Sequence, residues 1–189
     1  MKHSKILSTF VALLLIGSLH AQSSKGSGLS DSRGTTYKMS LGLRAGFEGG
    51  VTFKDFFRDN KAVELLLSRG WGYGGFRFTA LYEIQKGFSA VKGLDLYYGV
   101  GAHFANYDGA YYGYYGYYNG GYYDNHGHWH PTGYRHYYST FGIDGIIGIE
   151  YQIPDLPFNV SLDLKPYIDF YGYGSHYVDG ALSIRYNIK

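Results

Sequence analysis

The sequence predicts an all-β protein, an eight-stranded antiparallel up-and-down transmembrane β-barrel with one long extracellular loop. Its 189 residues include 29 glycines and 23 tyrosines, a composition that favours strands over helices. Charged residues make up 17% of the chain, below the roughly 25% of soluble domains. We infer that much of the surface does not face water. The third observation is an alternation of apolar and polar residues with a period of two, which a helix does not produce.

Residues 1–21 are predicted to be a cleaved signal peptide. Lys2 and Lys5 form a basic start, residues 6–16 are mostly apolar, and Ala21 ends a cleavage site. The apolar run is shorter than the ~20 residues of a membrane-spanning helix. The chain is therefore expected to be exported. Residues 22–35 are rich in Ser and Gly and predict a flexible leader, so that the barrel occupies residues 36–189.

The alternation defines eight strands. They are expected over residues 39–48, 51–57, 62–71, 76–85, 94–105, 141–151, 158–170 and 181–188. An even number of strands suits the closure of an antiparallel membrane barrel. Pro166 falls on the apolar face of its strand, and because proline lacks a backbone N–H, we expect a bulge or weak pairing there.

The connections differ between the two ends of the predicted barrel. Short turns are expected at residues 58–60, 86–92 and 154–157, whereas the other end carries turns at 48–50, 71–75 and 171–175 and an insertion of about residues 108–137. Longer loops of such barrels are extracellular. The insertion is therefore predicted on the outside, with both termini in the periplasm.

The alternation alone does not say which face of the strands points inward. A soluble lipocalin-like barrel also has eight strands, with its apolar face inside. Here the apolar face carries many large rings, whereas an eight-stranded interior is only just wide enough for side chains. We therefore predict small and charged residues inside, paired because a buried unpaired charge costs several kcal/mol. The interior charges are expected to include Arg44, Arg77, Glu83, Asp95, Asp144, Glu150, Asp163, Lys165 and Arg185.

Several segments resemble a known group of proteins. They are the N-terminal signal, the stretch Ala62-Val63-Glu64-Leu65-Leu66, the strand at residues 94–106 and the stretch Leu164-Lys165-Pro166-Tyr167. Together they look like small outer-membrane β-barrel proteins of Bacteroidetes type, similar to the OmpX/OmpA-like porin-fold families. The resemblance covers nearly the whole mature chain. It implies an outer-membrane location and contact with outer-membrane lipid.

The insertion contains a low-complexity tyrosine segment, YYGYYGYY at residues 111–118. Tyrosine supplies rigid amphipathic contact area at low entropic cost. Tyr112, Tyr115, Tyr118 and Trp129 are therefore candidate surface-contact residues. For the flanking tyrosines we favour an alternative, in which their rings join the aromatic girdle at the membrane interface.

A histidine motif, HGHWH, follows in the same insertion. Its residues His126, His128 and His130 lie on one face if the segment is a strand. Imidazole is a common ligand of zinc, copper and nickel, and haem iron is another candidate. A solvated polar loop is the default interpretation, because the segment is glycine-rich and Asp124 is its only nearby carboxylate.

Catalysis has little support in the sequence. His103, Ser139 and Asp144 are the residues that a catalytic interpretation would use, but no nucleophile elbow or phosphate-binding loop appears in a strand–helix context. We predict no enzyme activity and no cofactor. Without cysteine there is no thiolate metal site, and a formal net charge of +2, to which Lys2 and Lys5 contribute, gives no basic excess for nucleic acid.

The expected function is that of a monomeric, non-enzymatic outer-membrane scaffold. It displays the Tyr/Gly/His-rich loop for adhesion or for contact with a surface ligand or host molecule. Two alternatives stay open: narrow porin-like passive transport of small solutes, and a soluble lipocalin-like ligand-binding barrel. The small lumen of eight strands argues against the first.

Overall fold

A computed structural model describes residues 28–70, 75–108, 121–131, 137–170 and 176–188. Its elements are β1 (Met39–Gly46), β2 (Glu48–Arg58), β3 (Lys61–Gly70), β4 (Gly75–Gly87), β5 (Leu94–Asp108), β6 (Gly121–Tyr123), β7 (Trp129–Pro131), β8 (Tyr137–Gln152), β9 (Phe158–Asp169) and β10 (His176–Ile188). The signal peptide expected at residues 1–21 lies outside the described residues.

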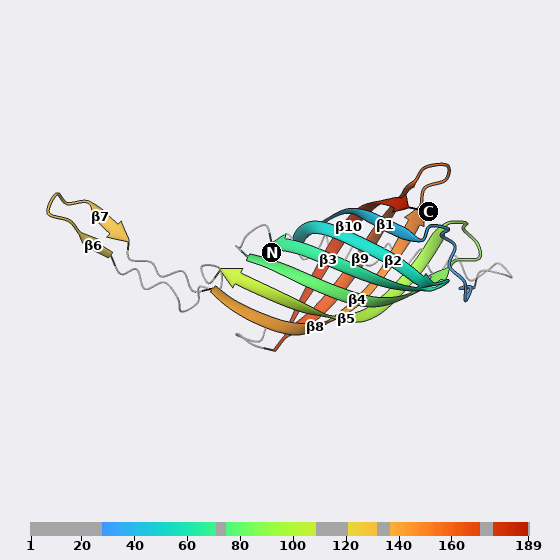
Figure 1. Ribbon diagram of the computed structural model, residues 1–189, viewed down its shortest axis with the longest axis horizontal. Helices are drawn as coiled ribbons and strands as arrows, with labels where there is room; N and C mark the ends of the chain where they lie inside the picture. Colours follow the sequence, from blue (N-terminus) through green and yellow to red (C-terminus); the bar gives the residue numbers. More distant parts are fainter. Residues whose placement is uncertain (1–27, 71–74, 109–120, 132–136, 171–175, 189) are drawn as a thin grey trace, which may run out of the picture.

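Eight of these strands form a closed antiparallel barrel in the order β1-β10-β9-β8-β5-β4-β3-β2 (Figure 1). Every strand pairs with its neighbours along the chain, and β1 closes the barrel on β10, from Met39 opposite Ile188 to Gly46 opposite Ala181. β6 and β7 form a separate two-stranded sheet within the insertion between β5 and β8. The predicted eight-stranded, up-and-down, all-β fold is therefore confirmed.

The two ends of the barrel differ as the sequence predicts. The short-turn end carries the connections at residues 59–60, 88–93 and 153–157, and the long-loop end carries the insertion between β5 and β8. One expected turn is wrong. Residues 48–50 belong to β2, and Phe47 alone connects β1 to β2, because the inward side chain of Glu48 is bound inside the barrel by Ser68.

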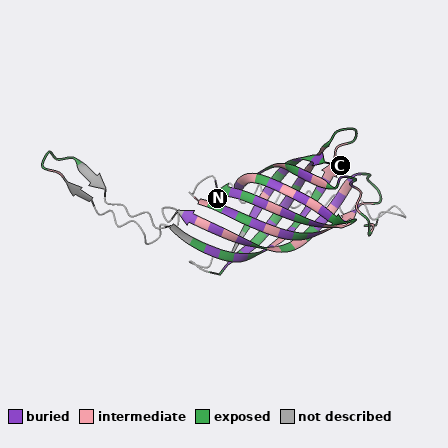
Figure 2. Ribbon diagram, viewed as in Figure 1, coloured by how far each residue is buried: buried purple, intermediate pink, exposed green. Residues whose placement is uncertain are grey.

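Burial alternates along the barrel strands, as Figure 2 shows by its purple and green bands. The outward positions carry exposed apolar side chains, and the inward positions carry polar ones. Exposed members from seven strands include Leu43, Val51, Phe78, Val100, Phe141, Ile147, Leu164 and Leu182. This is the orientation that the volume argument predicts, and it is the reverse of a lipocalin-like interior.

Pro166 weakens the β8–β9 ladder without shifting its register. Asp144 pairs with Tyr167 and Ile147 pairs with Leu164, but the two positions between them are unpaired in the ladder. On the other side of the strand, Pro166 still faces Val178 of β10. Proline cannot donate to a ladder, so the weak pairing that we predict is present and the bulge is not.

Residues 28–38, here called the N-terminal strap, lie against the short-turn end. The backbone of Ser30 donates to Gly87, and the Asn60 amide donates to the carbonyl of Asp31. Thr35 is buried. Part of the segment expected to be a flexible leader is thus bound to the barrel, because it meets buried acceptors that its Ser/Gly-rich composition does not reveal.

Among the residues that the structure describes, no helix is long and apolar enough to cross a membrane.

Candidate functional site

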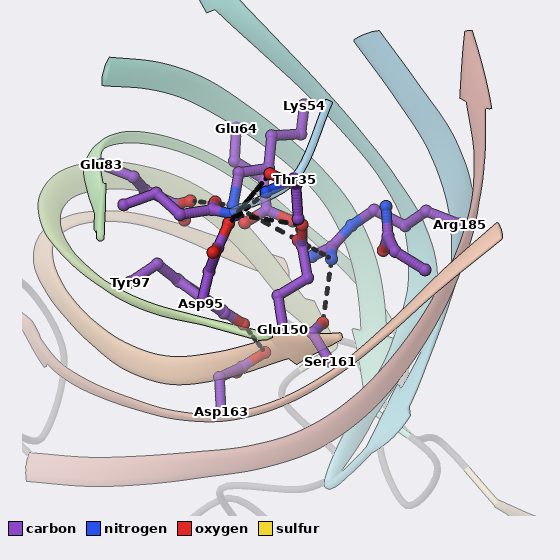
Figure 3. A network of polar contacts seen from close by, with 12 residues as sticks. Thr35, Lys54, Glu64, Glu83, Asp95, Tyr97, Glu150, Ser161, Asp163 and Arg185 are labelled. Atoms are coloured by element: carbon purple, nitrogen blue, oxygen red, sulfur yellow. Dashed lines mark hydrogen bonds and ion pairs between the residues drawn. The ribbon is translucent and has the colours of Figure 1, made fainter. Parts of the chain in front are cut away.

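The centre of the barrel holds a network of charged side chains, shown in Figure 3. Arg185 of β10 donates to Glu64 of β3 at 2.5 Å and to Glu150 of β8 at 3.3 Å. Lys54 of β2 lies 2.8 Å from Glu83 of β4 and 3.6 Å from Glu150. All five side chains are fully buried. Because they come from five strands, the network ties opposite walls of the barrel together.

An apolar cluster borders this network. It consists of Leu66, Leu81, Tyr97 and Ile146, all buried. Tyr97 also joins the polar groups on either side, since its hydroxyl donates to Asp163 at 2.9 Å and its ring lies 4.3 Å from the Lys54 ammonium. The cluster thus packs inside the barrel beside the polar groups that Tyr97 contacts.

A second polar network lies toward the long-loop end. Arg44 makes a bidentate contact with Asp163, at 2.8 and 2.7 Å, and reaches Asp179 at 3.1 Å. Arg77 lies 3.5 Å from Glu48, with its guanidinium 3.7 Å above the ring of Tyr167. Arginine suits such sites because its planar group bonds a carboxylate in two places and stacks on rings.

His103 links three strands in the same region. Its Nδ1 lies 2.7 Å from Asp144 of β8, and its Nε2 lies 2.7 Å from Asp169 of β9. Lys165 also contacts Asp144, at 3.1 Å. Opposite the ring is Gly142, where a Cβ would lie 2.3 Å from the imidazole. The glycine therefore makes room for His103.

The short-turn end is closed by the N-terminal strap. Asp95 accepts from the backbone of Gly34 at 2.6 Å and from the Thr35 hydroxyl at 2.9 Å. The Tyr37 hydroxyl donates to Glu150 at 2.6 Å. Burial, together with the Glu150 charge, raises the pKa of Tyr37, so its phenol stays protonated as a donor. The strap thus extends the polar interior to the end of the barrel.

All nine interior charges expected from the sequence are buried. Sequence reasoning underestimated the set on the inward face. Glu48 and Asp179 are also buried there. Glu48 ends the expected strand 39–48 but was also assigned to the expected turn 48–50, and Asp179 lies between the expected turn 171–175 and the expected strand 181–188. Tyr37 lies between the expected leader and the first expected strand. Extending the period-two alternation back through residue 179 would have found Asp179, whereas Tyr37 has no such signal.

The interior does not assemble the catalytic set that the sequence offered. His103 and Asp144 are in contact, but Ser139 is exposed and accepts a hydrogen bond from Asn106, on the other face of the sheet. What the described interior does chemically is to pair opposite charges. Its buried Asp, Glu, Lys, Arg and His side chains are nine carboxyls, five Lys or Arg side chains and His103, so the acids outnumber the bases.

The histidine motif forms the tip of the β6–β7 hairpin. Asp124 accepts from the backbone N–H groups of His126 and His128, at 2.8 and 2.9 Å. The rings of the two histidines are stacked, with centroids 6.5 Å apart, and both residues are exposed. They lie in a turn, so the expectation of one strand face for the whole motif is wrong. The reason is Gly127, whose φ of +81° reverses the chain.

The remaining predicted residues of the insertion are Trp129, His130 and three tyrosines. Trp129 and His130 lie on β7, but their side chains are outside the described set. Tyr112, Tyr115 and Tyr118 lie outside the described residues altogether. Within the described ranges, no group of three or more His, Cys, Asp or Glu side chains is arranged to hold a metal ion.

Comparisons with known proteins give one likeness of structure. No family model matches the chain, and no curated protein matches it. Among solved structures, the chain is similar to the crystal structure of neisserial surface protein A, with a TM-score of 0.49 and 9% sequence identity. The match covers 79% of this chain and 93% of that one. A likeness of this degree leaves the function to be argued from the chain itself.

Proposed function

We propose that the protein is a closed, non-enzymatic barrel of the outer membrane that displays the insertion between β5 and β8 on the cell surface. The observation that carries this proposal is the exposed apolar belt. Leu43, Val100 and Leu182 are 63%, 67% and 59% exposed, and they are surrounded by similar side chains on neighbouring strands. Soluble monomers rarely expose contiguous apolar patches beyond a few hundred Å², whereas lipid covers such a belt.

The backbone supports the same proposal. A chain that spans lipid has to pair its backbone N–H and C=O groups internally, and a closed barrel does so. Each barrel strand is paired on both sides, which also favours a monomer. The short-turn end then faces the periplasm and the long-loop end faces the outside, the arrangement typical of such barrels.

The filled interior favours a scaffold over a transport channel. Arg77, Arg185, Tyr97, Lys54 and Lys165 are among the largest fully buried side chains, and they come from five strands of the wall. An eight-stranded barrel has little lumen to spare. We therefore expect no steady conductance from the protein in planar bilayers; stable open steps would favour the porin-like alternative.

Orientation is testable by thiol labelling because the chain has no cysteine. In the variant N125C the new thiol lies at the exposed hairpin tip, and in D59C it lies in the exposed β2–β3 turn. A membrane-impermeant maleimide should label N125C on intact cells and D59C only after permeabilisation. The opposite pattern, or no labelling of either without lysis, would overturn the proposed display.

Contact with a ligand or host molecule is proposed for the tyrosines and Trp129 of the insertion. Bacteria expressing the protein should adhere to a fixed epithelial layer better than bacteria expressing a variant with Tyr112, Tyr115, Tyr118 and Trp129 replaced by Ser. The variant D59N is the matched control. Equal adherence of all three strains, at equal surface amounts, would remove the adhesive role.

A further inference from the structure

We propose that the tip of the β6–β7 hairpin binds one divalent transition-metal ion through the imidazoles of His126 and His128, with Asp124 positioning His128. The ion is of the class that prefers imidazole, namely Zn²⁺, Ni²⁺ or Cu²⁺. The inference deepens the proposed function, since it rests on the surface display of the insertion for its biological use. The binding chemistry itself rests only on the hairpin.

The first step is that the turn is fixed by its own hydrogen bonds. The backbone N–H of Asp124 donates to the carbonyl of His128 at 3.0 Å, and Gly127 donates back to Asp124 at 3.0 Å. The same carboxylate oxygen, Oδ1, accepts from the N–H groups of His126 and His128. The backbone positions from which the two imidazoles project are therefore set before any ion arrives.

The second step concerns the tautomer of His128. Oδ2 of Asp124 lies 3.3 Å from Nδ1 of His128. An ionised carboxylate only accepts hydrogen bonds, so this contact places a proton on Nδ1, and in the neutral ring the lone pair is then on Nε2. In metal sites a ligating histidine typically donates its other ring N–H to such a carboxylate, which orients the ring and increases its basicity. Here the orienting group is present and the opposite nitrogen is on an exposed ring.

The third step is the second imidazole. The ring of His126 lies nearly parallel to that of His128, at an interplanar angle of 22° and a centroid separation of 6.5 Å. Both side chains are exposed, and binding one ion requires the two rings to rotate until a nitrogen of each faces it. Water completes the coordination, because the described residues offer no cluster of three or more ligands. A site of this kind prefers zinc, nickel or copper to calcium and magnesium, which require oxygen ligands.

Calorimetric titration of the full chain, refolded in detergent, with Zn²⁺ and Ni²⁺ tests the inference. We expect one ion per chain, no binding of Ca²⁺, and weaker binding as the pH falls, because protons compete for the imidazoles. The double variant H126A/H128A should bind at least about tenfold more weakly. The variant D124N should also lose roughly tenfold, as outer-sphere partners do. Its amide still accepts the backbone bonds but presents an NH₂ group to His128.

Two controls separate this site from the other histidines and from general charge effects. H136A and D59N should bind as the wild type does. The inference is overturned if the wild type binds neither ion, if H126A/H128A binds as tightly as the wild type, or if H136A loses as much affinity. Thiol labelling of N125C is independent of these titrations. If the protein binds metal but N125C is not labelled on intact cells, the metal site stands and the proposed surface display is wrong. If N125C is labelled but no metal binds, only the proposed metal site is wrong.

Discussion

His103 and Asp169 join β5 to β9 through a contact of 2.7 Å between Nε2 and Oδ1, while the other ring nitrogen contacts Asp144 at the same distance. Ionised carboxylates accept hydrogen bonds only. If both aspartates are ionised, both ring nitrogens carry protons. His103 is then a cation that holds three strands together near the long-loop end.

Replacing His103 by Gln should destabilise the barrel. The amide donates to one aspartate and leaves the other carboxylate without its partner, at a cost of about 3 to 5 kcal/mol. The measurement is urea unfolding in lipid vesicles, followed by the heat-modifiable shift on a denaturing gel. The double variant H103Q/D169N should recover part of the loss, since it removes one of the two charges. An unfolding midpoint unchanged from wild type would contradict the proposed bridge.

The same bridge predicts a pH effect on stability. Stabilisation is present while the imidazole keeps both protons and is lost as the pH rises and one proton leaves. Arg77, Lys165 and Tyr167 also face the ring or its partners, but only His103 titrates near neutral pH when unperturbed. Wild-type stability should therefore fall with rising pH more steeply than that of H103Q. Parallel profiles would assign the effect to other groups.

Arg185 is expected to be the most sensitive residue of the central network. It contacts Glu64 at 2.5 Å, Glu150 at 3.3 Å and the Ser161 hydroxyl at 2.9 Å. The variant R185M removes the arginine from Glu64 and leaves Glu150 with Lys54 alone, at 3.6 Å, and it should cost about 3 to 5 kcal/mol. A double-mutant cycle with E64Q, measured by urea unfolding, should give a coupling of about 1 to 3 kcal/mol. Additive effects would show that the pair is not energetically linked.

Leu164 and Leu156 provide a matched test of the apolar belt. They are 54% and 53% exposed, but Leu164 lies in the middle of β9 and Leu156 in a turn. In lipid, L164R should cost about 2 to 4 kcal/mol, whereas L156R should change stability by less than about 0.5 kcal/mol. Unfolding from vesicles measures both. Equal, small effects would mean that the belt faces water.

The N-terminal strap depends on Asp95. This carboxylate accepts from Gly34, Thr35 and Gln85. In the variant D95A the amide protons of Gly34 and Thr35 should exchange with solvent roughly 10- to 100-fold faster, because each bond to a charged group contributes about 1.5 to 3 kcal/mol. Hydrogen exchange read by mass spectrometry reports this directly. Amides within β5 that keep their exchange rates serve as the internal reference.

Much of the barrel was predictable because alternation is imposed by a wall one strand thick. Every residue of such a wall faces either the interior or the exterior, so position assigns Leu41 and Arg44 to opposite faces, and the volume of the apolar side chains decides which face is outside. The strand ends were less predictable. β10 begins at His176 rather than near residue 181, because its first residues pair with the segment around Pro166. The residue pattern at 176–180 does not predict this pairing.

At the candidate site on the hairpin tip, the chemistry was predictable from the sequence but the local structure was not. The residue types of HGHWH indicated metal chemistry, but their arrangement did not follow from a strand pattern. It depends on Asp124 and Gly127, which turn the chain before His128. Likewise, the partners of Asp95 come from a strap sixty residues earlier in the chain, and a contact at that separation leaves no trace in local composition.

The closure of β1 on β10 also bears on the order of folding. β1 is the first barrel strand to be made and β10 the last, yet the two are hydrogen-bonded partners along eight residue pairs. Hairpins such as β9–β10 form from neighbours in the chain, but this final ladder cannot form until β10 has been synthesised. Long-range pairing of this kind makes folding slow. The unfinished chain therefore leaves the edges of β1 and of its latest strand unpaired, and closure of the barrel is expected as a single late step.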